Sequence, residues 1–182
     1  VVSLSITESK FFEYNDGIFV AGKDFDDWRA ANPTVDADFS SVNENEENAN
    51  YYRISDNEEQ KGHLSYFVGG QEVLNQDIGI EVNGGNSRNF QSKALRLIAR
   101  SEYGNDKMSY PFFANENYNS YKRLLLRNSG QDFRSTMFRD GLFHTLVEKL
   151  NTETKSYQPT IVFLNGEYWG ILNMRERYDK QF

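Results

Sequence analysis

Apolar and polar residues alternate along several short stretches of the chain, which is the pattern of half-buried β-strands. The clearest example is Ile78-Gly79-Ile80-Glu81-Val82, in which the apolar side chains share one face. A Gly69-Gly70 pair between two of these stretches is typical of a tight turn. The pattern predicts strands at residues 2–6, 17–21, 50–54, 64–68, 73–82, 93–100 and 122–127.

The segment 160–174 predicts a β-hairpin. Asn165-Gly166 lies between two apolar runs, and this dipeptide suits both central positions of a type I′ turn. Because both faces of the hairpin carry apolar residues, we expect it at the centre of a sheet rather than at an edge.

Residues 136–150 have the spacing of an amphipathic helix. Apolar residues recur at every fourth position, at Phe138, Leu142, Leu146 and Leu150. Asp132 or Ser135 is suited to cap its start, and Gly141 indicates that another group packs closely on the helix. We therefore expect an α+β fold, a mainly antiparallel sheet with this one principal helix packed on a face.

Charge divides the chain into two parts. The net charge is −7, to which residues 1–62 contribute 14 acids and 5 bases and residues 63–182 contribute 13 acids and 15 bases. We interpret residues 1–62 as acidic strands and a long polar loop, and residues 63–182 as the core of the same domain. The acidic opening disfavours nucleic-acid binding. No apolar run approaches the roughly 20 residues of a membrane span, and the absence of cysteine excludes disulfides.

Lys93 is the residue most suggestive of chemistry. It shares strand parity with Leu95 and Leu97, so its side chain is expected on their buried face. A buried ammonium group must reach out to solvent, pair with a carboxylate or meet an anionic ligand. The spacing alone leaves these alternatives open.

A glycine-rich turn precedes Lys93. Gly84, Gly85, Ser87 and Arg88 provide backbone N–H groups, a hydroxyl and a guanidinium, and such a nest holds a phosphate in some proteins. The same glycines fit an ordinary hairpin turn that requires positive φ angles. The turn is not a Walker loop, because no Gly-Lys-Ser/Thr sequence opens a helix.

The polar residues that flank the predicted helix and end the hairpin suit structural roles. Arg127, Asn128 and Asp132 precede the helix, where an arginine–carboxylate brace and a cap are expected. Glu176 has an arginine on each side, which indicates a surface ion-pair cluster.

No catalytic or metal site is recognisable from spacing alone. His63 and His144 have no partner pattern, and the aspartates between residues 24 and 38 lack EF-hand spacing. The chain has no Gly-x-Ser-x-Gly elbow, no His-Glu-x-x-His, and none of the His-Arg-Asp or Asp-Phe-Gly sequences of conventional kinases. Trp169 and the tyrosines would suit a carbohydrate-binding domain, but Trp169 lies in the apolar hairpin and is expected in the core.

Three segments, in order, resemble the CotH family of spore-coat-type secreted kinase-like proteins. They are residues 83–88 followed by Lys93, residues 126–132 with Phe138-Arg139-Asp140, and residues 164–170 with Glu176. The likeness covers about residues 78–178. This sequence departs from the family in having Gly85 where Asn is frequent and Gln91-Ser92 where Pro-Lys is common.

The resemblance implies the small lobe of an atypical protein-kinase-like fold. It implies ATP and a divalent metal as cofactors, with protein side chains as the substrates of the full-length protein. By the same resemblance Lys93 contacts phosphate, and Glu176 belongs to the nucleotide-binding set. The turn residues of that set are Gly84, Gly85, Ser87 and Arg88.

The family's catalytic and metal-binding acids lie beyond the final hairpin. The resemblance therefore implies that this chain is the N-terminal, nucleotide-binding portion of a secreted or cell-surface kinase. We expect it to be inactive alone and to have the C-terminal lobe of its parent as a partner. The alternative is a non-catalytic surface, coat-assembly or binding module that retains the lobe without the chemistry, and a carbohydrate-binding domain ranks below both.

Overall fold

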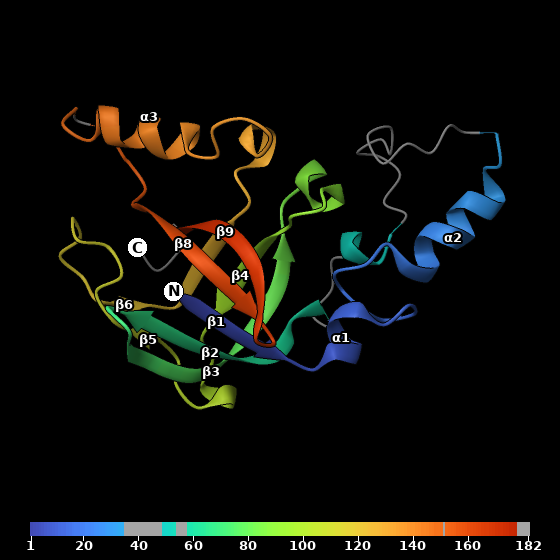
Figure 1. The fold of residues 1–182 in the computed structure, drawn as a ribbon, viewed down its shortest axis with the longest axis horizontal. Coiled ribbons are helices and arrows are strands. Elements are labelled where there is room, and N and C mark those ends of the chain that lie inside the picture. The colour runs from blue at the N-terminus through green and yellow to red at the C-terminus, as the bar shows by residue number, and fades with distance from the viewer. Residues whose placement is uncertain (35–48, 54–57, 151, 178–182) are drawn as a thin grey trace.

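The computed structural model describes residues 1–34, 49–53, 58–150 and 152–177. Seven strands form a closed barrel in the order β1-β2-β3-β4-β7-β9-β8 (Figure 1). A short pair of strands, β5 (Met108–Ser109) and β6 (Ser120–Tyr121), lies apart from it. The barrel strands are β1 (Val2–Ile6), β2 (Gln60–Val68), β3 (Gln71–Asn83), β4 (Ala94–Ile98), β7 (Arg123–Arg127), β8 (Tyr157–Leu164) and β9 (Glu167–Glu176).

The barrel closes through strands that are far apart in sequence. β1 pairs parallel with β8, with Val2 opposite Val162, whereas the other neighbours in the barrel are antiparallel. Asn165, in the β8–β9 turn at a φ of 50°, donates from its side-chain amide to the Ile6 carbonyl and accepts from the Ile6 N–H. The turn residue therefore ties the hairpin to β1, and closure removes exposed strand edges.

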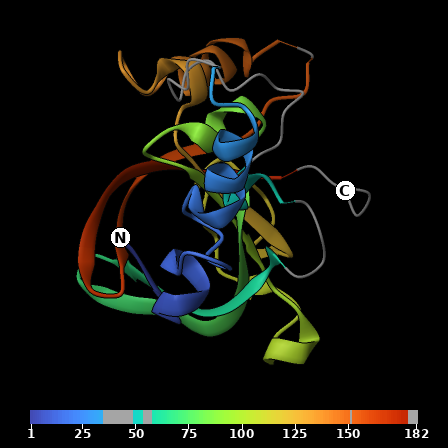
Figure 2. The ribbon, with the colours of Figure 1, turned by 90° about the vertical axis from the view of Figure 1, so that its right-hand side faces the viewer.

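Alternation along the strands supplies the core. On each strand every second side chain points into the barrel, which is the periodicity of a pleated sheet. Figure 2, turned by 90° from the first view, shows the strands curving around this interior. The buried residues there include Val2, Leu4, Leu64, Tyr66, Ile78, Ile80, Val82, Leu95, Leu97, Leu124, Leu126, Val162, Leu164, Leu172 and Met174.

In the described part of the chain, three short α-helices lie around the barrel: α1 (Glu8–Phe12), α2 (Gly22–Ala31) and α3 (Arg139–Val147). Figure 1 shows α2 and α3 extending on different sides, away from the strands. α1 buries Phe11, which stacks on Phe19 at a centroid distance of 5.0 Å. Trp169 of β9 packs against Phe19 as well; it is partly buried and lies against the core cluster rather than within it.

The expected α+β fold with one principal packed helix is wrong, because the described structure is mostly β and its helices are small. The predicted stripe on α3 faces solvent, with Leu142 43% and Leu146 65% exposed. The helix instead turns Gly141 toward the barrel, where an added Cβ would lie 2.7 Å from the Tyr157 ring. Spacing shows which side chains share a face, but it does not show which face meets the neighbour.

Most predicted strands are confirmed, including the hairpin, although residues 17–21 and 50–53 are not strands; residue 54, the end of the second predicted strand, lies outside the described residues. Residues Asn50–Tyr52 form a 3₁₀ turn. The side chain of Asn50 competes there with strand pairing, since it donates to the Tyr14 carbonyl and accepts from the Asp24 N–H. The hairpin buries one face alone, because Ile161 and Ile171 on its outer face are exposed.

Within the described residues, none of the helices has the length and apolar composition required to cross a bilayer.

Candidate functional site around Lys93

Lys93 lies just before β4 and is 5% exposed, so the prediction that it shares the buried face with Leu95 is confirmed. Its Nζ donates a hydrogen bond of 2.7 Å to the Phe90 carbonyl. The ammonium group also lies over two aromatic rings, 4.3 Å from the centroid of Tyr51 and 5.2 Å from that of Phe19. Such cation–π contacts stabilise the charged form of a desolvated lysine.

Burial changes the pKa of the Lys93 ammonium group. It lowers the pKa of Lys93 from 10.5 to about 8. No carboxylate of residues 1–34, 49–53, 58–150 or 152–177 forms an ion pair with this ammonium group. Of the alternatives left open by the sequence, the ordinary ion pair is therefore not realised among these residues.

Lys93 borders a cavity of about 710 Å³. Phe90 and Phe133 stack on one another with centroids 4.8 Å apart, and the Arg134 guanidinium lies 5.2 Å from the Phe133 centroid. Two cations and four aromatic rings thus line the cavity, and no described carboxylate does. The lining residues are Phe19, Ala21, Tyr51, Asn89, Phe90, Gln91, Lys93, Gln131, Phe133 and Arg134.

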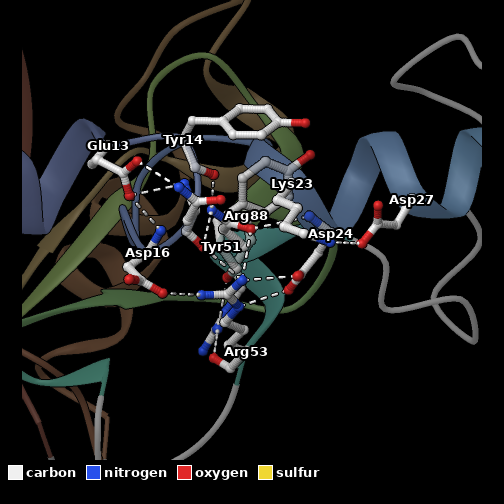
Figure 3. Close-up of polar contacts among 11 residues, drawn as sticks. Glu13, Tyr14, Asp16, Lys23, Asp24, Asp27, Tyr51, Arg53 and Arg88 are labelled. Atoms are coloured by element: carbon white, nitrogen blue, oxygen red, sulfur yellow. Dashed lines mark hydrogen bonds and ion pairs between the residues drawn. The ribbon is translucent and has the colours of Figure 1, made fainter.

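The 3₁₀ turn Asn50–Tyr52 places Tyr51 over Lys93, and a polar network holds the following residue in place. Arg53 donates two hydrogen bonds to Asp24, of 2.6 and 2.8 Å, and pairs with Asp16 at 3.7 Å. Figure 3 shows the Arg53 guanidinium between these two carboxylates. Hydrogen bonds from Arg53, together with its charge, lower the pKa of Asp24.

The glycine-rich turn is tied to the same segment by Arg88. Its Nε donates to the Gly84 carbonyl at 2.7 Å, and its Nη1 donates to the carbonyls of Tyr51 at 2.9 Å and Arg53 at 3.3 Å. Gly84 has a φ of 133°, and a Cβ there would lie 2.5 Å from the Ser87 hydroxyl oxygen. Arg88 thus positions the turn against Tyr51, and its assignment as a phosphate contact stays a prediction.

Gly85 and Ser87 line a second cavity, of about 630 Å³, on the Arg127 side of the turn. The two cavities share Asn89, Phe90 and Gln131 as walls. The structure therefore places the glycine-rich turn next to the Lys93 cavity.

Asn128 fixes the segment between the turn and Lys93. It is 2% exposed, and its amide donates to the carbonyls of Ser92 at 2.5 Å and Ser87 at 3.5 Å. The expected arginine–carboxylate brace is confirmed, since Arg127 pairs with Asp140. Asp132 accepts a hydrogen bond from the Arg139 N–H at the start of α3, but the N-cap position is held by Phe138 and not by Asp132 or Ser135. No sequence pattern indicates that the Asn128 side chain reaches across to residues 87–92.

Glu176 is not brought together with Lys93. The strand register places it opposite Leu124, which lies opposite Leu97, four residues or about 13 Å along the strand from Lys93. It is 1% exposed and accepts hydrogen bonds from the Ser156 N–H at 2.9 Å and from the Tyr118 hydroxyl. Glu176 therefore faces the barrel interior, and the expected surface position is wrong for this residue.

Residues 80–182, more than half of the chain, match the family model described as CotH kinase protein. The chain belongs to the CotH family. The resemblance drawn from three sequence segments is thereby confirmed. A search of curated proteins finds no match.

The CotH match covers the glycine-rich turn, Lys93, the Arg127–Asn128 segment and the hairpin. It does not cover Phe19, Ala21 or Tyr51, which supply one wall of the Lys93 cavity. The cavity of this CotH-family chain is thus built from the matched region and from the preceding residues together.

CotH membership also raises the question of a divalent metal. Among the described residues, no group of three or more His, Asp or Glu side chains is arranged to hold a metal ion. His63 contacts Asp77 at 2.8 Å, and His144 accepts a hydrogen bond from the Lys155 N–H. Asp24 is paired with Arg53, whereas Asp36 and Asp38 lie outside the described residues.

Proposed function

We propose that this CotH-family chain binds ATP in the Lys93 cavity, with the Lys93 ammonium group in contact with phosphate. One observation carries the proposal: a lysine that is 5% exposed borders a cavity of about 710 Å³ and has no carboxylate partner among the described residues. Removing a charge from water costs several kcal/mol unless another group compensates it. An anionic ligand in the cavity provides that compensation.

The walls of the cavity suit the rest of a nucleotide. Phe19, Tyr51, Phe90 and Phe133 present aromatic surfaces to a planar base, and Arg134 adds a second cation. The volume lies in the usual range for small-molecule sites. Bound ATP would supply the phosphoryl group for transfer to a protein side chain, the activity that the CotH resemblance implies.

The remaining parts of the proposal rest on family membership. They are action as a kinase on protein side chains and a secreted or cell-surface location. The described residues do not form a metal site, so we derive no phosphoryl-transfer step from them. The alternative, a non-catalytic surface or coat-assembly module, differs from a kinase in transferring no phosphate to protein.

Calorimetric titration of ATP into the unmodified chain and into the Lys93→Met variant tests nucleotide binding. Because a hydrogen bond to a charged group contributes about 1.5–3 kcal/mol, we expect the Kd for ATP to rise about 10–100-fold. Lys107→Met, which changes an exposed lysine, is the matched control and should leave the Kd unchanged. Equal affinity of the Lys93 variant and the unmodified chain would show that Lys93 does not contact the nucleotide.

A further inference from the structure

The Tyr51 side chain carries a hydroxyl group without a hydrogen-bond partner among the described residues. Tyr51 is 3% exposed, so water does not satisfy this hydroxyl at the surface. Burial, with a smaller contribution from neighbouring Tyr52, raises the pKa of Tyr51 to about 12. The hydroxyl therefore remains protonated and available as a donor across the physiological pH range.

A buried hydroxyl without a partner destabilises the fold, because its hydrogen bonds to water are lost and no hydrogen bond within the protein replaces them. Most buried polar groups in proteins have a partner, and an exception needs a physical reason. Such atoms occur elsewhere in the described residues, for example Gln76 Nε2 and Arg96 Nε. Neither lines the Lys93 cavity, whereas Tyr51 does.

The position of Tyr51 is set by several contacts rather than by chance packing. Its carbonyl accepts from Arg88 at 2.9 Å, which links it to the glycine-rich turn. Its ring lies over the Lys93 ammonium group, at 4.3 Å from the centroid. A ligand anion that reaches Lys93 therefore comes close to the Tyr51 side chain.

We propose that the Tyr51 hydroxyl donates a hydrogen bond to an anionic oxygen of the ligand held by Lys93. The inference rests on the proposed nucleotide binding and deepens it, because it assigns a binding residue outside the CotH-matched range. The Tyr51 ring shields the lysine from water, and its hydroxyl and the Lys93 ammonium group both donate to the phosphate. Arg88 acts as a positioning residue, since it holds the backbone of Tyr51 rather than the ligand.

Tyr51→Phe tests this role because it removes the hydroxyl and keeps the ring. Calorimetric titrations with ATP, inorganic tripolyphosphate and adenosine separate contacts to phosphate from contacts to the base. We expect the Kd for ATP and tripolyphosphate to rise roughly tenfold and the Kd for adenosine to stay unchanged. The melting temperature without ligand should stay equal or rise, because an unsatisfied buried hydroxyl has been removed.

Tyr52→Phe is the matched control, since Tyr52 is buried beside Tyr51 but does not line the cavity. It should leave all three dissociation constants unchanged. A change below twofold for ATP and tripolyphosphate in Tyr51→Phe would refute the hydroxyl contact while the proposed function stands. A loss confined to adenosine would also refute it, because the donor would then face the base. If the unmodified chain binds neither ATP nor tripolyphosphate, the proposed function fails, and this inference fails with it.

Discussion

β4 and α3 both have regular apolar spacing in the sequence, yet the apolar side chains of β4 are buried and those of α3 are exposed. Leu95 and Leu97 of β4 are completely buried, and the interior face they share also takes up Lys93. On α3 the apolar side chains face outward, and Phe143 and Leu146 are 60% and 65% exposed. A cation is therefore buried on the strand while leucines are exposed on the helix.

The difference arises from how each element meets its neighbours. A strand has two faces, and once β4 pairs with β3 and β7 in a closed barrel, one face must point inward. α3 has no such constraint, because it lies outside the barrel and meets it where Gly141 approaches the Tyr157 ring and Asp140 pairs with Arg127. A glycine allows close approach of the backbone, so the helix packs by its small residue rather than by its apolar stripe.

The largest effect is expected from shortening an interior residue of β4. Leu95→Ala removes methyl groups from a fully buried site opposite Leu126 and leaves a cavity. We expect the free energy of unfolding to fall by about 2–5 kcal/mol. Urea denaturation followed by circular dichroism measures it, and a loss below about 1 kcal/mol would contradict the closed interior.

Lys93→Met should change the free energy of unfolding by an intermediate amount and should raise it, whereas Leu95→Ala lowers it. The pKa of Lys93 is about 8 in the folded chain and near 10.5 when unfolded, so below pH 8 the folded state bears the full cost of its charge. Between these pH values the unfolded chain binds more protons, so stability rises with pH. A pKa difference of this size corresponds to roughly 3 kcal/mol. We expect the variant to be more stable by about 1–3 kcal/mol at pH 7, with the advantage shrinking as the pH approaches 10.

Denaturant titrations at pH 7 and pH 9.5 measure this trend, with Lys107→Met as the exposed control. The control should match the unmodified chain at both pH values. A Lys93→Met variant that is less stable at pH 7 would mean that the Phe90 hydrogen bond and the ring contacts outweigh the cost of burial.

The pattern of residues along the sequence predicted the features that depend on residues close to one another in the chain. Alternation located β3, β4 and β7, Asn165-Gly166 located the hairpin, and parity predicted the burial of Lys93. Features that depend on distant residues were not predictable in this way. The parallel contact of β1 with β8 and the burial of Glu176 beside Ser156 join segments whose sequences carry no mutual signal.

The cavity shows the same division between local and distant information. Lys93 and the glycine-rich turn were recognised from sequence, but Tyr51 was assigned to a strand. The side-chain hydrogen bonds of Asn50 prevent that strand, and Arg88 then fixes the segment over Lys93. Hydrogen bonds that span more than 30 residues therefore decide the shape of the site, and no spacing rule describes them.

The smallest effect is expected on α3, at Leu146→Ala. Leu146 is 65% exposed, so its truncation removes little buried area, and alanine has the higher helix propensity. We expect the free energy of unfolding to change by less than about 0.5 kcal/mol, measured in the same urea series as Leu95→Ala. Equal losses in the two variants would show that the stripe is buried in solution and would remove the contrast between β4 and α3. A small loss in the free energy of unfolding for Leu146→Ala and a large loss for Leu95→Ala would establish the contrast. The same leucine-to-alanine substitution would then differ in effect because the backbone turns Leu95 inward and Leu146 outward.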